Sequence, residues 1–178
     1  IPIALEYECI KRSIHLIHIG SGCIFFGQSP HTRHYQFTPG AGEGIYHLVD
    51  VGWKETDFAN PQSFYSKTKY ACDLAIGGMP NVTILRIRMP ISTKNTPRNL
   101  INKLIGYDKI VDTLNSVTFM DDVARCVDWV IKNQVFGTFH LASSKPVSPV
   151  QIMREYQKYV PYHKFSVISE AELDNLTI

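Results

Sequence analysis

The chain has 178 residues, of which 44% are hydrophobic and 19% are charged. That length suits a single domain with one hydrophobic core. The 18 basic and 16 acidic residues nearly balance, whereas nucleic acids and anionic membranes attract clustered Lys and Arg. No apolar run is long enough to span a bilayer, and the 4 cysteines are too sparse for a disulfide framework. We therefore expect a cytoplasmic protein with no nucleic-acid or membrane partner.

The N-terminal part predicts a helix and then a buried strand. Apolar residues recur at helical spacing over residues 1–10, and Pro2 is tolerated in a first helical turn. The apolar run 15–19 is typical of a buried strand, and it ends in Gly-Ser-Gly. Between residues 27 and 52 periodicity is lost and turn-forming residues predominate. We expect a long loop there.

The remaining sequence alternates between helical and strand patterns. Helices are predicted at 64–76, 97–105, 121–131 and 149–159, and strands at 81–88, 110–111, 117–119 and 138–141. Asp121 or Asp122 is expected to cap the third of these helices. This alternation predicts an α/β fold with a largely parallel sheet.

Ligands in such folds lie beyond the carboxyl ends of the strands. That rule selects three strand exits, at residues 20–23, 88–92 and 142–144. We expect the chemistry of the protein at these positions.

Tyr65 and Lys69 are four residues apart at the start of a predicted helix. Their side chains therefore share one helix face, where the ammonium group favours release of the phenolic proton. The spacing alone is not specific, because Tyr7 and Lys11 share it in what we interpret as an ordinary amphipathic helix.

A hydroxyl residue at the preceding strand exit makes the pattern more specific. Ser21, then Tyr65 and Lys69, resembles the arrangement of the extended short-chain dehydrogenase/reductase superfamily, in the branch that acts on nucleotide sugars. The segments 52–57, 82–92 and 97–99 extend the resemblance over most of residues 1–165. Within that branch the chain is most similar to the bifunctional 3,5-epimerase/4-reductases of UDP-rhamnose synthesis and to the dTDP-4-dehydrorhamnose reductases.

The resemblance implies a role for each matching residue. Ser21 would hydrogen-bond the 4-keto oxygen of the sugar, and Tyr65 would donate a proton to that oxygen while NADPH delivers hydride to C4. Lys69 would hold the nicotinamide ribose and tune Tyr65. The residues expected to line the cofactor site at the second strand exit are Met89, Pro90 and Ile91.

The resemblance also implies an epimerising pair, which maps to Cys23 and Lys103. The protons at C3 and C5 are acidified by the C4 ketone, so inversion needs an acid/base group near each face of the ring. The alternative for Cys23 is a small buried apolar residue. The alternative for Lys103 is a solvated position on a helix.

Arginines are candidates for the diphosphate of the substrate, because a guanidinium group matches phosphate geometry. Arg98, beside Asn99, is the first choice for the substrate site, ahead of Arg33 and Arg88. Arg86 alternates with apolar neighbours on a strand and is expected to make a structural ion pair. His31 and His34 lack a third ligand, so no metal site is expected.

The glycine-rich turn of a dinucleotide site is absent from the sequence. The 11 glycines contain no GxxGxxG pattern, and the segment 40–44 lacks the flanking strand and helix of a phosphate loop, so we interpret it as a mobile lid. We therefore expect a Rossmann-like fold whose N-terminal Gly-rich βαβ part is missing. Residues 1–92 would form the cofactor and catalytic portion, and residues 93–178 mainly the substrate-binding portion.

These inferences predict an NADPH-dependent oxidoreductase. Its substrate would be a UDP- or dTDP-linked 4-keto-6-deoxyhexose, converted to a rhamnose nucleotide by 3,5-epimerisation and 4-keto reduction, and a homodimer is allowed for. Two alternatives stay open. The first is reduction alone, and the second is a non-catalytic regulatory or interaction module that keeps the fold.

Overall fold

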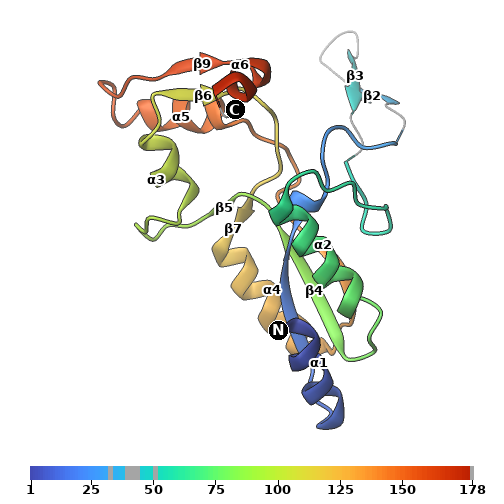
Figure 1. Cartoon of the computed structure of the whole chain (residues 1–178). Coiled ribbons are helices and arrows are strands. Elements are labelled where there is room, and N and C mark those ends of the chain that lie inside the picture. Colours follow the sequence, from blue (N-terminus) through green and yellow to red (C-terminus); the bar gives the residue numbers. More distant parts are fainter. Residues whose placement is uncertain (32–33, 39–44, 50–51, 177–178) are drawn as a thin grey trace.

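The fold is built around a parallel sheet of three strands (Figure 1). In this sheet β4 (Val82–Ile87) lies between β1 (Leu16–Ser21) and β8 (Gly137–Leu141), and both neighbours run parallel to it. The predicted α/β fold with a largely parallel sheet is confirmed. The residues described by this computed structural model are 1–31, 34–38, 45–49 and 52–176.

Three helices accompany the sheet, namely α1 (Pro2–Lys11), α2 (Phe64–Ile76) and α4 (Met120–Asn133). Helix α1 packs on α2, and both contact β1. Ser63 begins α2, because its hydroxyl accepts a hydrogen bond from the backbone N–H of Ser66 and so satisfies one free donor of the first turn. Ile76, Val82 and Ile84 form the buried core between α2 and the sheet.

The C-terminal layer has a core of its own. It contains α3 (Leu100–Ile105), β6 (Lys109–Val111), α5 (Pro149–Gln157), β9 (Ser166–Ile168) and α6 (Glu170–Leu176). Leu104, Ile110, Val150 and Met153 are buried together there, and β6 runs parallel to β9. A short parallel pair, β5 (Pro90–Ile91) and β7 (Thr118–Phe119), lies between this layer and the central sheet (Figure 1).

Two local predictions are wrong. The expected loop between residues 27 and 52 contains an antiparallel pair, β2 (His34–Thr38) and β3 (Ile45–Val49), whose β-forming residues are hidden among turn formers. The lid predicted at 40–44 lies outside the described residues. Neither Asp121 nor Asp122 caps α4, which starts after Phe119 without a side-chain cap. Both carboxylates lie in the first turn, where the helix dipole favours negative charge.

No helix in the described ranges combines the length and the apolar character that crossing a membrane would require.

A buried ion pair joins α2 to the central strand. The Arg86 Nε of β4 donates to the Asp73 Oδ2 of α2 at 2.7 Å, and the two side chains are 8% and 2% exposed. This confirms the structural ion pair expected for Arg86. The same guanidinium donates to the backbone carbonyl of Glu55 at 3.4 Å and lies 3.3 Å from the His140 Nε2. Arg86 therefore connects β4 to α2, to β8 and to the segment that precedes α2.

Arg86→Met is expected to destabilise the fold strongly. It leaves the Asp73 carboxylate buried without its cation, and removing one partner of a buried pair costs about 3–5 kcal/mol of unfolding free energy. Urea denaturation followed by circular dichroism measures the change.

Lys132→Met is the matched control, because Lys132 pairs with Asp128 on the surface at 70% and 62% exposure. Such exposed pairs contribute about 0.2–1 kcal/mol. If Arg86→Met lowers the unfolding free energy no more than the control does, the buried pair is not important for stability.

Candidate active site

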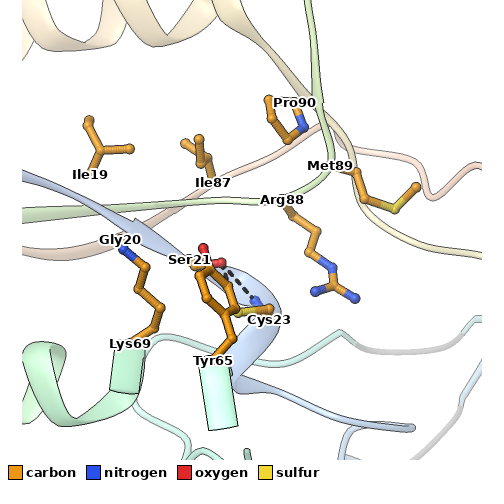
Figure 2. A pocket seen from close by; sticks show the side chains of 10 residues that line it. All are labelled: Ile19, Gly20, Ser21, Cys23, Tyr65, Lys69, Ile87, Arg88, Met89 and Pro90. Carbon is orange, nitrogen blue, oxygen red and sulfur yellow. Dashed lines mark hydrogen bonds between the residues drawn. The ribbon is translucent and has the colours of Figure 1, made fainter. Parts of the chain in front are cut away.

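A pocket of about 340 Å³ lies at the carboxyl ends of β1 and β4. Its position agrees with the rule for ligand sites in α/β folds. Figure 2 shows the side chains that line it, drawn from the two strand exits and from α2. The lining residues are Ile19, Gly20, Ser21, Cys23, Tyr65, Lys69, Ile87, Arg88, Met89 and Pro90. The first two of the three predicted strand exits therefore meet at one cavity.

Ser21 and Cys23 form the β1 side of the pocket. The Ser21 hydroxyl accepts a hydrogen bond from the Cys23 backbone N–H at 3.3 Å and thereby starts the short 3₁₀ helix η1 (Gly22–Ile24). The Ser21 Oγ also donates to the Cys23 Sγ at 3.0 Å. The hydroxyl and the thiol are thus neighbours at the end of the strand, and both reach the cavity.

Tyr65 and Lys69 come from the first turns of α2. The Lys69 Nζ lies 5.7 Å from the centre of the Tyr65 ring, as expected for side chains one turn apart on the same helix face. Tyr65 is 57% exposed at the mouth of the pocket, and Lys69 is half-buried. Figure 2 shows both side chains extending from α2 toward the end of β1.

Arg88 and Met89 form the β4 side. The Arg88 backbone N–H donates to the Thr118 Oγ1 at 2.9 Å, and its Nε donates to the Asn115 Oδ1 at 2.8 Å. Burial lowers the pKa of Arg88, and the charge of Cys23 opposes this shift. Met89 has a φ of 42° directly before Pro90, a backbone conformation that is strained for a residue with a side chain.

Several predicted site residues do not line the pocket. Lys103 is exposed on α3, Arg98 is exposed in the turn before that helix, and Ile91 lies in β5. The third predicted strand exit also lies outside the cavity. At this exit the Ser143 hydroxyl donates to the backbone carbonyl of Lys145 at 2.9 Å.

Asn99 is engaged within the fold. It is 7% exposed and caps α3, where its Oδ1 accepts from the backbone N–H groups of Ile101 and Ser92. Its Nδ2 donates to the carbonyls of Ser92 and Lys94 at 2.7 and 3.2 Å. These bonds use both ends of the amide.

Arg88, rather than Arg98, is the arginine that reaches the cavity. Its position at the second strand exit agrees with the rule for ligand sites. The Nε2 of His31 lies 2.8 Å from the Asp57 carboxylate. Among the residues with described side chains, no cluster of His, Cys, Asp and Glu is suited to a metal ion.

Two histidines near the site are held in the neutral form. Burial lowers the pKa of His18, against the attraction of Asp73 and with a contribution from the Lys69 charge. Burial also lowers the pKa of His140, whose neighbour Glu55 opposes the shift. The folded protein therefore resists protonation at both positions.

Comparisons with known proteins agree with this fold. The chain is 35% identical to the bifunctional dTDP-4-dehydrorhamnose 3,5-epimerase/dTDP-4-dehydrorhamnose reductase of Arabidopsis thaliana over 160 residues, which are 89% of this chain and 48% of that protein. The crystal structure of the L780 UDP-rhamnose synthase from Acanthamoeba polyphaga mimivirus matches with a TM-score of 0.82 and 29% identity, over 98% of this chain and 57% of that one.

A dTDP-4-dehydrorhamnose reductase from Bacillus anthracis, solved in complex with NADP, matches with a TM-score of 0.68 and 18% identity, over 90% of this chain and 53% of that one. This last likeness shows the fold alone. The chain spans about half the length of these relatives.

The fold is that of an α/β protein of Rossmann-like type, and a cavity lies at its strand exits. Residues 2–172 match the family described as the RmlD substrate binding domain. The chain belongs to this family, as the resemblance in the sequence implied.

Acidification is expected to destabilise the protein. Unfolded histidines take up protons below about pH 6.5, whereas His18 and His140 do so only at lower pH in the folded state, so stability falls as the pH falls through that value. Thermal unfolding midpoints at about pH 7.5 and about pH 5.5 measure the effect.

His140→Gln removes one of the two groups and should flatten the dependence. An unfolding midpoint that rises on acidification would contradict the neutral state of these histidines.

Proposed function

We propose that this chain carries the catalytic pocket of an oxidoreductase that reduces the 4-keto group of a UDP- or dTDP-linked 4-keto-6-deoxyhexose, giving a rhamnose nucleotide. The convergence of Ser21, Tyr65 and Lys69 on one cavity carries the proposal. The reductase and UDP-rhamnose synthase activities named for the Arabidopsis and mimivirus relatives support it.

Each side chain has a task in the reduction. The Ser21 hydroxyl rotates from the Cys23 sulfur to donate a hydrogen bond to the 4-keto oxygen. The Tyr65 phenol gives its proton to the same oxygen as negative charge develops there. The Lys69 ammonium, beside the phenol, stabilises the phenolate that remains and binds the ribose of the cofactor. NADPH, when bound, supplies the hydride for C4.

The cavity fits the reacting ends of the two ligands. A volume of about 340 Å³ is at the low end for ligand sites, enough for a sugar ring and part of a nicotinamide riboside but too small for a complete dinucleotide. Tyr65, Lys69, Met89 and Pro90 on its wall are the residues proposed for the cofactor. The pyrophosphate then needs a separate cradle.

That cradle would come from a segment outside these 178 residues. In the described part of the chain, β1 pairs with β4 alone, so its other edge is free. Beside it, Ile3, Tyr7 and Ile10 of α1 are 60%, 57% and 43% exposed. The longer relatives support further chain at this edge, and residues 1–92 would complete the cofactor and catalytic portion with it. Residues 93–178 would mainly bind substrate, although β8 returns to the central sheet.

The proposed activity includes epimerisation at C3 and C5 before reduction. Cys23 is suited to exchange these protons, because its thiol lines the cavity beside Ser21, which holds the ketone. A base at one ring face removes the proton, the electron pair moves to the C4 oxygen as an enolate, and an acid at the opposite face returns a proton to carbon. The second group in the proposal is Lys103, with Arg98 and Asn99 on the substrate side.

Reduction alone is the second candidate function. It is favoured by the position of Lys103, which is exposed on α3 and outside the cavity. In that case the substrate arrives already epimerised.

Tyr65→Phe is expected to lower the kcat of ketone reduction by about 10²- to 10⁴-fold, because the variant cannot protonate the alkoxide. The measurement is NADPH oxidation by the full-length polypeptide with a 4-keto-6-deoxy nucleotide sugar. Tyr70→Phe, on the same helix but outside the cavity, is the matched control. Unchanged turnover in Tyr65→Phe would show that the catalytic assignment of Tyr65 is wrong.

Epimerisation is tested separately, without NADPH, by incubating UDP-4-keto-6-deoxyglucose with the protein in deuterated water. We expect deuterium at C3 and C5, and Cys23→Ala should slow its uptake by at least about 100-fold while reduction of pre-epimerised substrate is spared. Cys72→Ala, outside the cavity, should exchange normally. No deuterium at either carbon would leave reduction alone, and normal exchange by Lys103→Ala would remove that lysine from the mechanism.

A further inference from the structure

A buried threonine of β7 holds the turn at the end of β4. The Thr118 side chain is 1% exposed. Its hydroxyl accepts a hydrogen bond from the Arg88 backbone N–H at 2.9 Å and donates to the Leu141 carbonyl at 2.6 Å. These two bonds use the one proton of the hydroxyl and one of its lone pairs. Thr118 therefore connects the exit of β4 to the end of β8.

The backbone of Thr118 holds the same turn from the other side. In the β5–β7 pair, Pro90 lies opposite Thr118. The residues immediately before and after Met89 are thus both held by one residue, the first through the Thr118 side chain and the second through strand pairing. A further hydrogen bond supports this arrangement, because the Arg88 Nε donates to the Asn115 Oδ1 at 2.8 Å.

Met89 has a backbone conformation that needs such support. Its φ of 42° lies in the left-handed region, which is unfavourable for a residue with a side chain. A residue before proline also prefers an extended backbone. Strained conformations of this kind persist only where the surrounding structure imposes them. Without the Thr118 hydroxyl, we expect the turn to relax toward the extended form.

The strained turn forms one wall of the cavity. Arg88, Met89 and Pro90 all line it, and Figure 2 shows Met89 and Pro90 across the pocket from α2. The turn also packs on the exit of β1, because a Cβ atom added at Gly22 would lie 3.5 Å from the Arg88 Cβ. A relaxed Met89 would therefore change the shape of the cavity as well as the stability of the fold.

We propose that Thr118 is a positioning residue whose hydroxyl keeps Met89 left-handed and so preforms the cavity wall for the nicotinamide end of the cofactor. This inference rests on the proposed function, in which Met89 and Pro90 contact the cofactor. Thr118 is not among the residues that line the cavity, so it acts through the turn. It sets the fraction of molecules whose turn has the conformation that binds the cofactor.

Thr118→Val tests the proposal, because valine keeps the shape of threonine and lacks the hydroxyl. NADPH is titrated into the full-length polypeptide, and the fluorescence of its nicotinamide reports binding. The Kd of NADPH should rise about 5- to 100-fold in Thr118→Val, because the strain of the turn is no longer compensated. Thr118→Ser keeps the hydroxyl and should bind NADPH nearly as well as the unmodified protein.

Thr83→Val is the matched control. Thr83 is also buried, at 0% exposure, and its hydroxyl donates to the Val135 carbonyl at 2.5 Å and lies 2.7 Å from the His15 Nε2. It is near the amino end of β4 and does not line the cavity. Both valine variants should lose stability, but only Thr118→Val should weaken NADPH binding. Equal Kd values for the two folded variants would overturn the positioning role.

Amide hydrogen exchange tests the hydrogen bond to Thr118 without any ligand. The Arg88 N–H lies beyond the last residue of β4, Ile87, yet it should exchange slowly in the unmodified protein and about 5- to 10-fold faster in Thr118→Val. Thr118→Ser and Thr83→Val should keep the slow exchange. Fast exchange of this amide in the unmodified protein overturns the inference, even if Thr118→Val does not fold.

The strain at Met89 is tested by a second pair of variants. Alanine usually gives a more stable protein than glycine, but glycine adopts a positive φ at no steric cost. Met89→Gly should therefore unfold at a higher temperature than Met89→Ala. The opposite order would show that Met89 needs no support from Thr118.

These readouts separate the inference from the proposed function. NADPH binding that depends on Thr118, in a polypeptide that does not reduce the sugar ketone, would reject the function and keep the positioning role. Normal NADPH binding and normal reduction by a folded Thr118→Val variant would do the reverse.

Discussion

The geometry of the candidate site depends on the buried pair between Arg86 and Asp73. Arg86 belongs to the central strand and Asp73 to α2, so their 2.7 Å contact sets how far along the sheet the helix lies. Asp73, Lys69 and Tyr65 are successive positions four residues apart on that helix, so fixing the first places the other two at the strand ends. Besides its effect on stability, a buried ion pair can specify one arrangement of the chain, and here that arrangement forms the pocket.

Close packing at the end of β1 reinforces this constraint. A Cβ at Gly20 would lie 3.0 Å from the Ile84 Cγ2 and 3.3 Å from the Asp73 Oδ1. The absence of a side chain at Gly20 therefore lets α2 lie close over the strand. Ser21 follows immediately and opens into the cavity. The Ser21 hydroxyl and the Tyr65 phenol of the proposed mechanism therefore reach the same cavity. They do so because the close packing at Gly20 and the ion pair to Asp73 fix the position of α2 on the sheet.

The sequence predicted the parts of the site that local spacing determines. Ser21 ends an apolar run, and Tyr65 and Lys69 share a helix face, so both features were visible from neighbouring residues. Whether Lys103, Arg98 and Asn99 approach the pocket depends on how the C-terminal layer packs against the sheet, which no local pattern specifies. Asn99 also shows that a helix cap and a ligand-binding amide look alike in a sequence. The β2–β3 pair was missed because its strands are short and surrounded by glycine and proline.

The central claim is that the Ser21, Tyr65 and Lys69 pocket reduces a sugar ketone. Labelled hydride transfer tests it most directly. The full-length polypeptide is given NADPH that carries deuterium at the reactive position of the nicotinamide, together with a 4-keto-6-deoxy nucleotide sugar, and the product is examined by NMR. The account predicts deuterium at C4 of the sugar, with labelled product forming about 10²- to 10⁴-fold more slowly in Tyr65→Phe. A product without deuterium at C4, or labelling by Tyr65→Phe at an equal rate, would contradict it.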